Sequence, residues 1–140
     1  MHAPLTSENQ DMPLIKIDLI DGRSDDQVKT LLDAAHCAVV EAFQVPEGDR
    51  YQIVNEHRPS RLIVKDTGLG IDRTDNVVVI TVISRPRTEE SKVLFYQLLA
   101  KGLREKCGIA ASELVVSIVT NTDADWSFGY GRAQFLTGEL

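Results

Sequence analysis

The chain has 140 residues, of which 43% are hydrophobic and 26% charged, a length and balance that suit one globular domain. Its formal net charge of −6 argues against a partner with a phosphate backbone, because nucleic-acid binders need a basic face. No apolar run approaches the roughly 18 residues of a membrane-spanning helix, so we expect neither nucleic acid nor a membrane as a partner.

The N-terminal segment, residues 1–12, is polar and without periodicity, and we predict that it is disordered or removed. Met12 offers a second start site. Removal of this methionine as an initiator would leave Pro13 with a free secondary amine, which is basic, nucleophilic and held on a rigid ring. If residues 1–12 stay attached, Pro13 is an internal imide with no lone pair for chemistry. Residues 13–140 are predicted to form a single domain.

The first half of this domain predicts a strand, a helix and a strand. Residues 14–20 are almost continuously apolar, which indicates a buried strand. Ser24 suits a helix N-cap, with acidic residues after it, and apolar residues at helical spacing continue to about Phe43. Residues 51–55 indicate a second strand, and residues 61–64 suggest a short further one.

The second half repeats this pattern at a shift that aligns Arg23 with Arg87 and Pro13 with Val77. It predicts a strand, a helix N-capped by Thr88, and a last strand. A β-α-β unit written twice predicts an α/β (α+β) fold, a four-stranded mixed sheet with two helices on one face. Because the other face of the sheet stays uncovered, we expect it to form an oligomer interface.

The turn Arg85-Pro86-Arg87 is the most unusual polar feature of the sequence. Paired guanidinium groups bind carboxylates through their planar forks, and the amides of the following helix add partial positive charge. The plainer interpretation is a solvated turn in which Arg87 pairs with a neighbouring glutamate. Asp49, in the loop after the first helix, is either an ordinary turn residue or a carboxylate that orients a cationic amine or a water.

The C-terminal tail concentrates aromatic side chains among glycines, with Trp126, Phe128 and Phe135 as examples. These side chains either pack against the sheet or a neighbouring subunit, or form an apolar wall that excludes water from a small site. The two cysteines, Cys37 and Cys107, fall in apolar helical patterns and predict reduced core thiols in a cytoplasmic protein. The histidines lack metal-ligand spacing, so we expect no metal.

The doubled β-α-β unit headed by Pro13 resembles the tautomerase superfamily, whose members use an amino-terminal proline. Asp49, the Ser84-Arg85-Pro86-Arg87 turn and the Asp125-Trp126-Ser127-Phe128-Gly129 tail are similar to the malonate semialdehyde decarboxylase family within it, and the similarity covers residues 13–140. The resemblance implies a homotrimer with no metal and no organic cofactor. The catalytic residues that it implies are Pro13, Asp49, Arg85 and Arg87. The substrate-binding residues that it implies are Arg85, Arg87, Trp126, Phe128, Phe135 and Leu140.

The reaction implied by the resemblance is decarboxylation of malonate semialdehyde (3-oxopropanoate) to acetaldehyde and CO₂. A protonated Pro13 amine would polarise the aldehyde oxygen, where negative charge develops, while the paired arginines hold the carboxylate. Attack by a neutral Pro13 to form an iminium is a competing route. The alternatives are a tautomerase or hydratase of small carboxylic acids that uses the same proline, and a non-catalytic trimeric binding protein if residues 1–12 are retained.

Overall fold

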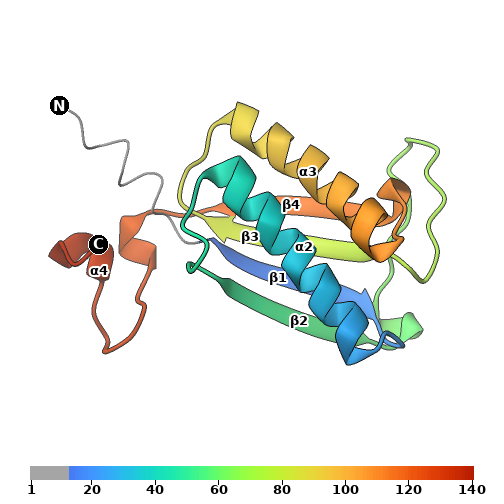
Figure 1. Ribbon diagram of the computed structural model, residues 1–140, viewed down its shortest axis with the longest axis horizontal. Helices are drawn as coiled ribbons and strands as arrows, with labels where there is room; N and C mark the ends of the chain where they lie inside the picture. The colour runs from blue at the N-terminus through green and yellow to red at the C-terminus, as the bar shows by residue number, and fades with distance from the viewer. Residues whose placement is uncertain (1–12) are drawn as a thin grey trace.

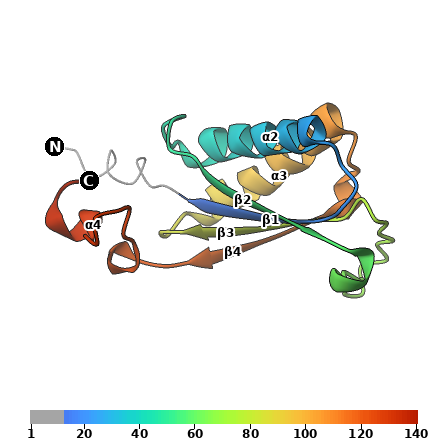
Figure 2. The same ribbon diagram turned by 90° about the horizontal axis from the view of Figure 1, so that it is seen from below.

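The computed structural model describes residues 13–140, so the prediction for residues 1–12 lies outside the described part of the chain. These residues form two layers, a twisted four-stranded sheet and a pair of long helices that cover one of its faces (Figures 1 and 2). The strands are β1 (Leu14–Ile20), β2 (Tyr51–His57), β3 (Val78–Ser84) and β4 (Leu114–Thr120). The helices are α2 (Asp25–Phe43), α3 (Glu89–Cys107) and the short α4 (Gln134–Thr137).

Local sequence signals set the ends of both long helices. The Ser24 hydroxyl accepts the backbone N–H of Gln27, whose side chain accepts the N–H of Ser24 in return, a capping box that fixes the start of α2. The Thr88 hydroxyl caps α3 by accepting the backbone N–H of Ser91. Gly108 ends α3 in the left-handed conformation, at a φ of 66°, which glycine adopts without steric cost.

The sheet order is β2-β1-β3-β4, with β1 parallel to β2, β3 parallel to β4, and β1 antiparallel to β3. The two units β1-α2-β2 and β3-α3-β4 therefore meet at the centre of one mixed sheet, which confirms the fold class predicted from the repeat. In this register Leu14 pairs with Ile83, so β1 begins where β3 ends. The C-terminal tail lies at this same end of the sheet (Figures 1 and 2).

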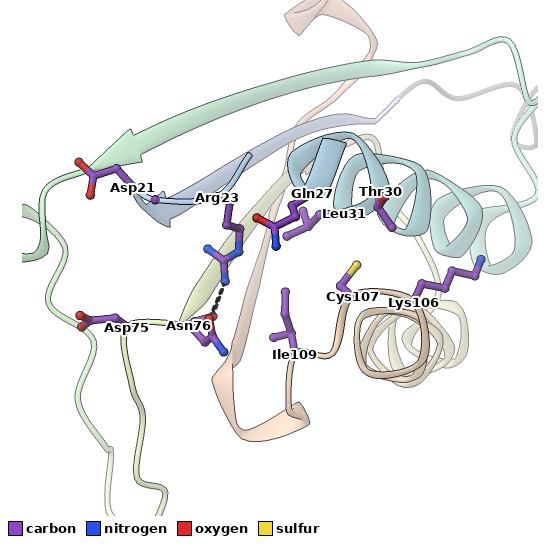
Figure 3. Close-up of a pocket in the computed structure, with 11 residues that line it drawn as sticks. Asp21, Arg23, Gln27, Thr30, Leu31, Asp75, Asn76, Lys106, Cys107 and Ile109 are labelled. Carbon is purple, nitrogen blue, oxygen red and sulfur yellow. Dashed lines mark hydrogen bonds between the residues drawn. The ribbon is translucent and has the colours of Figure 1, made fainter. Parts of the chain in front are cut away.

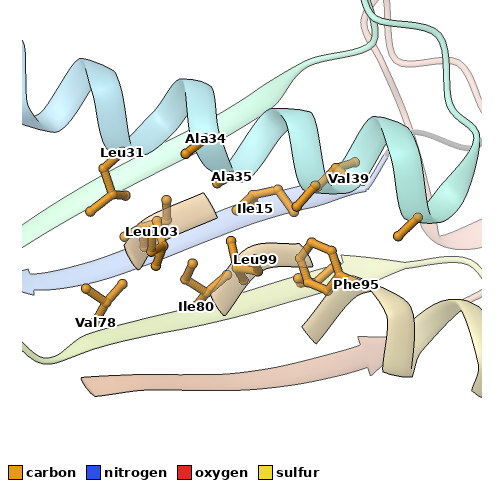
Figure 4. Close-up of a cluster of buried hydrophobic side chains, with 14 of the residues drawn as sticks. Ile15, Leu31, Ala34, Ala35, Val39, Val78, Ile80, Phe95, Leu99 and Leu103 are labelled. Carbon is orange, nitrogen blue, oxygen red and sulfur yellow. The ribbon is translucent and has the colours of Figure 1, made fainter. Parts of the chain in front are cut away.

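The core fills the space between the helices and the sheet (Figure 4). Alternate residues of β1 and β3 point into it, and the helices contribute a stripe at helical spacing. Its fully buried large side chains include Ile17, Leu19, Leu31, Ile80, Phe95, Leu99 and Leu103. The opposite face of the sheet carries exposed apolar side chains such as Ile53 and Val119, as expected for a face that no helix covers.

Two predictions about the first half are wrong. Residues 61–64 form no strand: Pro59–Arg61 is a turn of 3-10 helix, and β2 is the edge strand with β1 as its one partner. Cys37 is exposed rather than part of the core, because it lies off the stripe of α2 that faces the sheet, whereas Cys107 is half-buried. Within residues 13–140, no helix has both the length and the apolar character needed to cross a membrane.

Candidate active site

Three segments of the chain converge where β1 begins. Pro13 is buried and directly precedes β1, and one step beyond the β1–β3 register it faces Ser84, the last residue of β3. The loop that carries Asp49 leads into β2, whose first residue Tyr51 pairs with Leu14. Asp49 is partly buried, and this burial raises the pKa of its carboxyl group. Topology thus brings together the head of β1, the arginine turn and the Asp49 loop.

Arg85 is held between a carboxylate and an aromatic ring of the C-terminal tail. Its Nη1 donates to Oδ1 of Asp123 at 2.6 Å, and its guanidinium carbon lies 3.8 Å from the centroid of the Phe135 ring. The Arg85 side chain is only 12% exposed. Stacking on a ring and an ion pair leave a guanidinium with few accessible orientations, so this cation is fixed relative to the end of β3.

Arg87 points the other way, toward the C-terminal end of α2. Its Nε donates to the hydroxyl of Ser84 at 3.0 Å, its Nη1 donates to the carbonyl of Phe43 at 3.2 Å, and its guanidinium carbon lies 4.8 Å from the Phe43 ring centroid. The fully buried Ser84 hydroxyl donates in turn to the carbonyl of Arg85 at 2.8 Å. One serine therefore links the backbone of Arg85 to the side chain of Arg87.

Phe128 contacts both Trp126 and Phe135, and these three side chains form what we call the aromatic wall. Phe128 stacks on Trp126 with ring centroids 5.4 Å apart, and meets Phe135 edge-on at 5.3 Å. Tyr51 of β2 stacks on Phe128 at 5.9 Å, which ties the tail to the edge of the sheet. The indole N–H of Trp126 donates to Oδ1 of Asn121 at 2.7 Å. Such pairs are worth about 0.5–1.5 kcal/mol each beyond the area they bury.

The structure therefore brings Arg85 and the aromatic wall into contact, and places Pro13 across from Ser84, whose hydroxyl Arg87 contacts. Leu140 is the exception among the predicted substrate-binding residues: it is 53% exposed, and its backbone N–H donates to the carbonyl of Gln134. Sequence reasoning assigned no role to the residues that orient these groups. They are Tyr51, Ser84, Asn121, Asp123 and Gln134.

The second β-α-β unit has a counterpart of this corner at the opposite end of the sheet (Figure 3). A cavity of about 620 Å³ there is lined by Arg23, the repeat equivalent of Arg87. Arg23 donates to the backbone and side-chain oxygens of Asn76, and an aspartate, Asp21, stands where the repeat has Arg85. Burial raises the pKa of the Cys107 thiol in this cavity, which disfavours a nucleophilic thiolate. Of these two equivalent ends of the sheet, only the proline end therefore carries a pair of arginines.

Comparison with known proteins decides the family. Two family models, both described as tautomerase enzyme, match residues 49–129 and 13–72. The chain belongs to the tautomerase superfamily. A Bacillus subtilis (strain 168) protein described as a probable tautomerase, YrdN, is 59% identical over 129 residues, which are 92% of this chain and 100% of that protein.

Among tautomerases of known structure, two malonate semialdehyde decarboxylases are similar to this chain. One, whose structures are described as a basis for decarboxylase and hydratase activities, is 58% identical with a TM-score of 0.88, over 91% of this chain and 98% of that one. The other, inhibited by 3-bromopropiolate, is 42% identical with a TM-score of 0.86, over 91% and 97%. A fused 4-OT solved as an asymmetric trimer shares the fold at 21% identity, a TM-score of 0.72 and coverages of 89% and 98%.

Proposed function

We propose that this tautomerase-superfamily protein decarboxylates malonate semialdehyde to acetaldehyde and CO₂. The observation that carries the proposal is the group of residues where β1 begins. Pro13 lies across from Ser84, Arg85 and Arg87 follow Ser84 in the chain, and Phe135 of the aromatic wall packs on Arg85. Similarity to two malonate semialdehyde decarboxylases supports the choice of reaction.

The chemistry needs a cation at the aldehyde oxygen. When the bond between C2 and the carboxylate carbon breaks, CO₂ leaves and the bonding electrons form an enolate whose charge lies largely on that oxygen. A protonated Pro13 amine beside this oxygen stabilises the developing charge, which lowers the barrier. Proton transfer to the enolate carbon then gives acetaldehyde. The proposal therefore requires that the active form begin at Pro13, because an internal proline carries no amine.

Asp49 has the complementary role in this scheme. An ionised carboxylate near the Pro13 amine favours the ammonium form, which must persist at the working pH. Because burial raises the pKa of Asp49, this carboxyl loses its charge at a higher pH than an exposed aspartate does. The acid limb of activity is therefore assigned to Asp49 and the alkaline limb to Pro13.

Arg85 and the wall act on the substrate carboxylate in this scheme, while Arg87 holds Ser84 and the C-terminal end of α2. A guanidinium held as rigidly as Arg85 can fix the carboxylate with the breaking bond out of the plane of the carbonyl, where it overlaps the π system. The wall excludes water on this side, and a less hydrated carboxylate converts more readily to neutral CO₂. A homotrimer, in which the uncovered sheet faces pack together, is part of the proposal and agrees with the trimeric fused 4-OT of the same fold.

The second candidate is a tautomerase or hydratase that acts on small carboxylic acids at the same corner. The description of YrdN as a probable tautomerase favours it, as does the hydratase activity named for the 58% identical decarboxylase. A tautomerase needs Pro13 neutral, as a base, whereas the decarboxylase needs it charged.

A pH–rate profile of the chain that begins at Pro13 separates the two. We expect CO₂ release from malonate semialdehyde to fall as the Pro13 amine loses its proton, and activity that rises over that range would favour the tautomerase. Borohydride added with the substrate tests the iminium route: an adduct on Pro13 in the intact mass would replace the cationic mechanism with a covalent one.

A further inference from the structure

We propose that Gln134 is a positioning residue that holds the aromatic wall against Arg85, an inference that rests on the proposed function. Gln134 is the first residue of α4 and only 9% exposed, unusual burial for a polar side chain outside the core. Its Oε1 accepts the backbone N–H of Phe128 at 2.9 Å, and its Nε2 donates to the carbonyl of Gly129 at 2.9 Å. One amide thereby binds the backbone of a wall residue and of the residue that follows it.

The segment held in this way has an irregular backbone. Gly129, Tyr130 and Gly131 all have positive φ angles, of 135°, 60° and 67°, so this stretch cannot join a regular helix or strand. Phe128 is half-buried, and a buried backbone N–H without a partner costs about 1–3 kcal/mol, so the bond from this N–H to Gln134 stabilises the loop. The exposed carbonyl of Gly129 also accepts the N–H of Arg132 at 3.3 Å.

Two successive contacts connect the Gln134 side chain to Arg85. Gln134 binds the backbone of Phe128 through its side chain and is the chain neighbour of Phe135. It therefore sets the 5.3 Å edge-on contact between these two rings. Phe135 in turn lies 3.8 Å from the guanidinium carbon of Arg85. A shift of the Phe128 loop would move the wall and release one face of the arginine.

A glutamine is suited to this task because its side chain offers a donor and an acceptor at one end. An ionised carboxylate has no hydrogen to give to the carbonyl of Gly129, whereas a protonated carboxyl can make both bonds. Gln134→Glu therefore turns the proposed contact into one that depends on pH, with almost no change in side-chain volume.

The experiment compares Gln134→Glu with the wild type, both in the form that begins at Pro13, across pH. We expect kcat/KM of the variant to be about tenfold below wild type when the new carboxyl is ionised, the loss expected for about one unsatisfied hydrogen bond. The ratio of variant to wild type should return toward one as the pH falls. Gln134→Leu, which can make neither bond, should be impaired at every pH. Gln97→Glu, on the exposed face of α3, is the matched control and should track wild type.

Trp126 is the only tryptophan and stacks on Phe128, so its fluorescence reports the wall without any need for turnover. In Gln134→Glu the emission should change with the same pH midpoint as the activity ratio, and in Gln97→Glu it should not. An activity ratio and an emission that are both independent of pH in Gln134→Glu would overturn the positioning role. If no form releases CO₂ but the emission still titrates in Gln134→Glu alone, the proposed reaction fails while the placement of the wall by Gln134 stands.

Discussion

Arg85→Lys is the most informative single change at the corner, because it keeps the positive charge and removes the planar fork. The Arg85 side chain is 12% exposed, stacks on Phe135 at 3.8 Å and donates to Asp123 at 2.6 Å. Lysine cannot stack as a plane or make two parallel hydrogen bonds to a carboxylate. Arg85→Lys should therefore lose both the orientation of the substrate and part of its binding.

The expected loss follows from the contacts removed. The stacking of the guanidinium on Phe135 contributes about 1 kcal/mol, and one hydrogen bond from the guanidinium to the substrate carboxylate contributes about 1.5–3 kcal/mol. Together these give about 3 kcal/mol of transition-state stabilisation, or roughly a hundredfold in kcat/KM at 1.36 kcal/mol per factor of ten. The assay is the initial rate of acetaldehyde formation from malonate semialdehyde over a range of substrate concentrations.

Arg132→Lys is the matched control in the same tail. Arg132 lies 5.5 Å from the Tyr130 ring centroid and 3.5 Å from Glu139, the same kinds of contact as Arg85, but its side chain is largely exposed. We expect it to keep kcat/KM within about twofold, because exposed ion pairs contribute little. Equal losses in the two variants, or wild-type activity in Arg85→Lys, would refute a specific role for Arg85.

Two further changes test the carboxylate and the fold. Asp49→Asn should abolish the acid limb of the pH–rate profile, since burial raises the pKa of Asp49 and its charge is lost as the pH falls through that value. Because burial raises the pKa of Asp49, this side chain favours folding only while it is protonated. Asp49→Asn should therefore not lower the free energy of unfolding at neutral pH. A large decrease of that free energy, measured by urea titration, would contradict this. Leu99→Ala should lower that free energy by about 3 kcal/mol, since Leu99 is fully buried, whereas the exposed Leu69→Ala should leave it within about 0.5 kcal/mol. Urea titration at one protein concentration measures the free energy of unfolding of both leucine variants, and equal losses in the two would contradict the assigned core.

The fold was predictable because its signals are local and repeated. Caps at Ser24 and Thr88 mark the helix starts, and the repeat fixes which strands pair in parallel. The two wrong predictions came from local patterns whose outcome depends on residues distant in the sequence. Cys37 sits in an apolar helix but off the stripe that faces the sheet, and residues 61–64 have no strand to pair with.

The site was predictable only in part, because its contacts join segments far apart in the sequence through an irregular tail. The arginine turn and the tail aromatics stand out by residue type. No local sequence pattern indicates a role for Gln134 or Asp123. Their contacts with Phe128 and Arg85 form only because of the path of the tail, in which several residues have positive φ angles. Ser84 belongs to the turn that resembles the family, but its type alone does not indicate that its buried hydroxyl connects both arginines.

The central claim is that Pro13 works as a free amine, and CO₂ release by two forms of the same chain tests it most directly. One form begins at Pro13 and the other keeps all 140 residues, each confirmed by intact mass. We predict that the Pro13 form releases CO₂ from malonate semialdehyde at least about a hundredfold faster, the low end of what a positioned acid contributes. Equal rates in the two forms, or no CO₂ release by the Pro13 form, would contradict it.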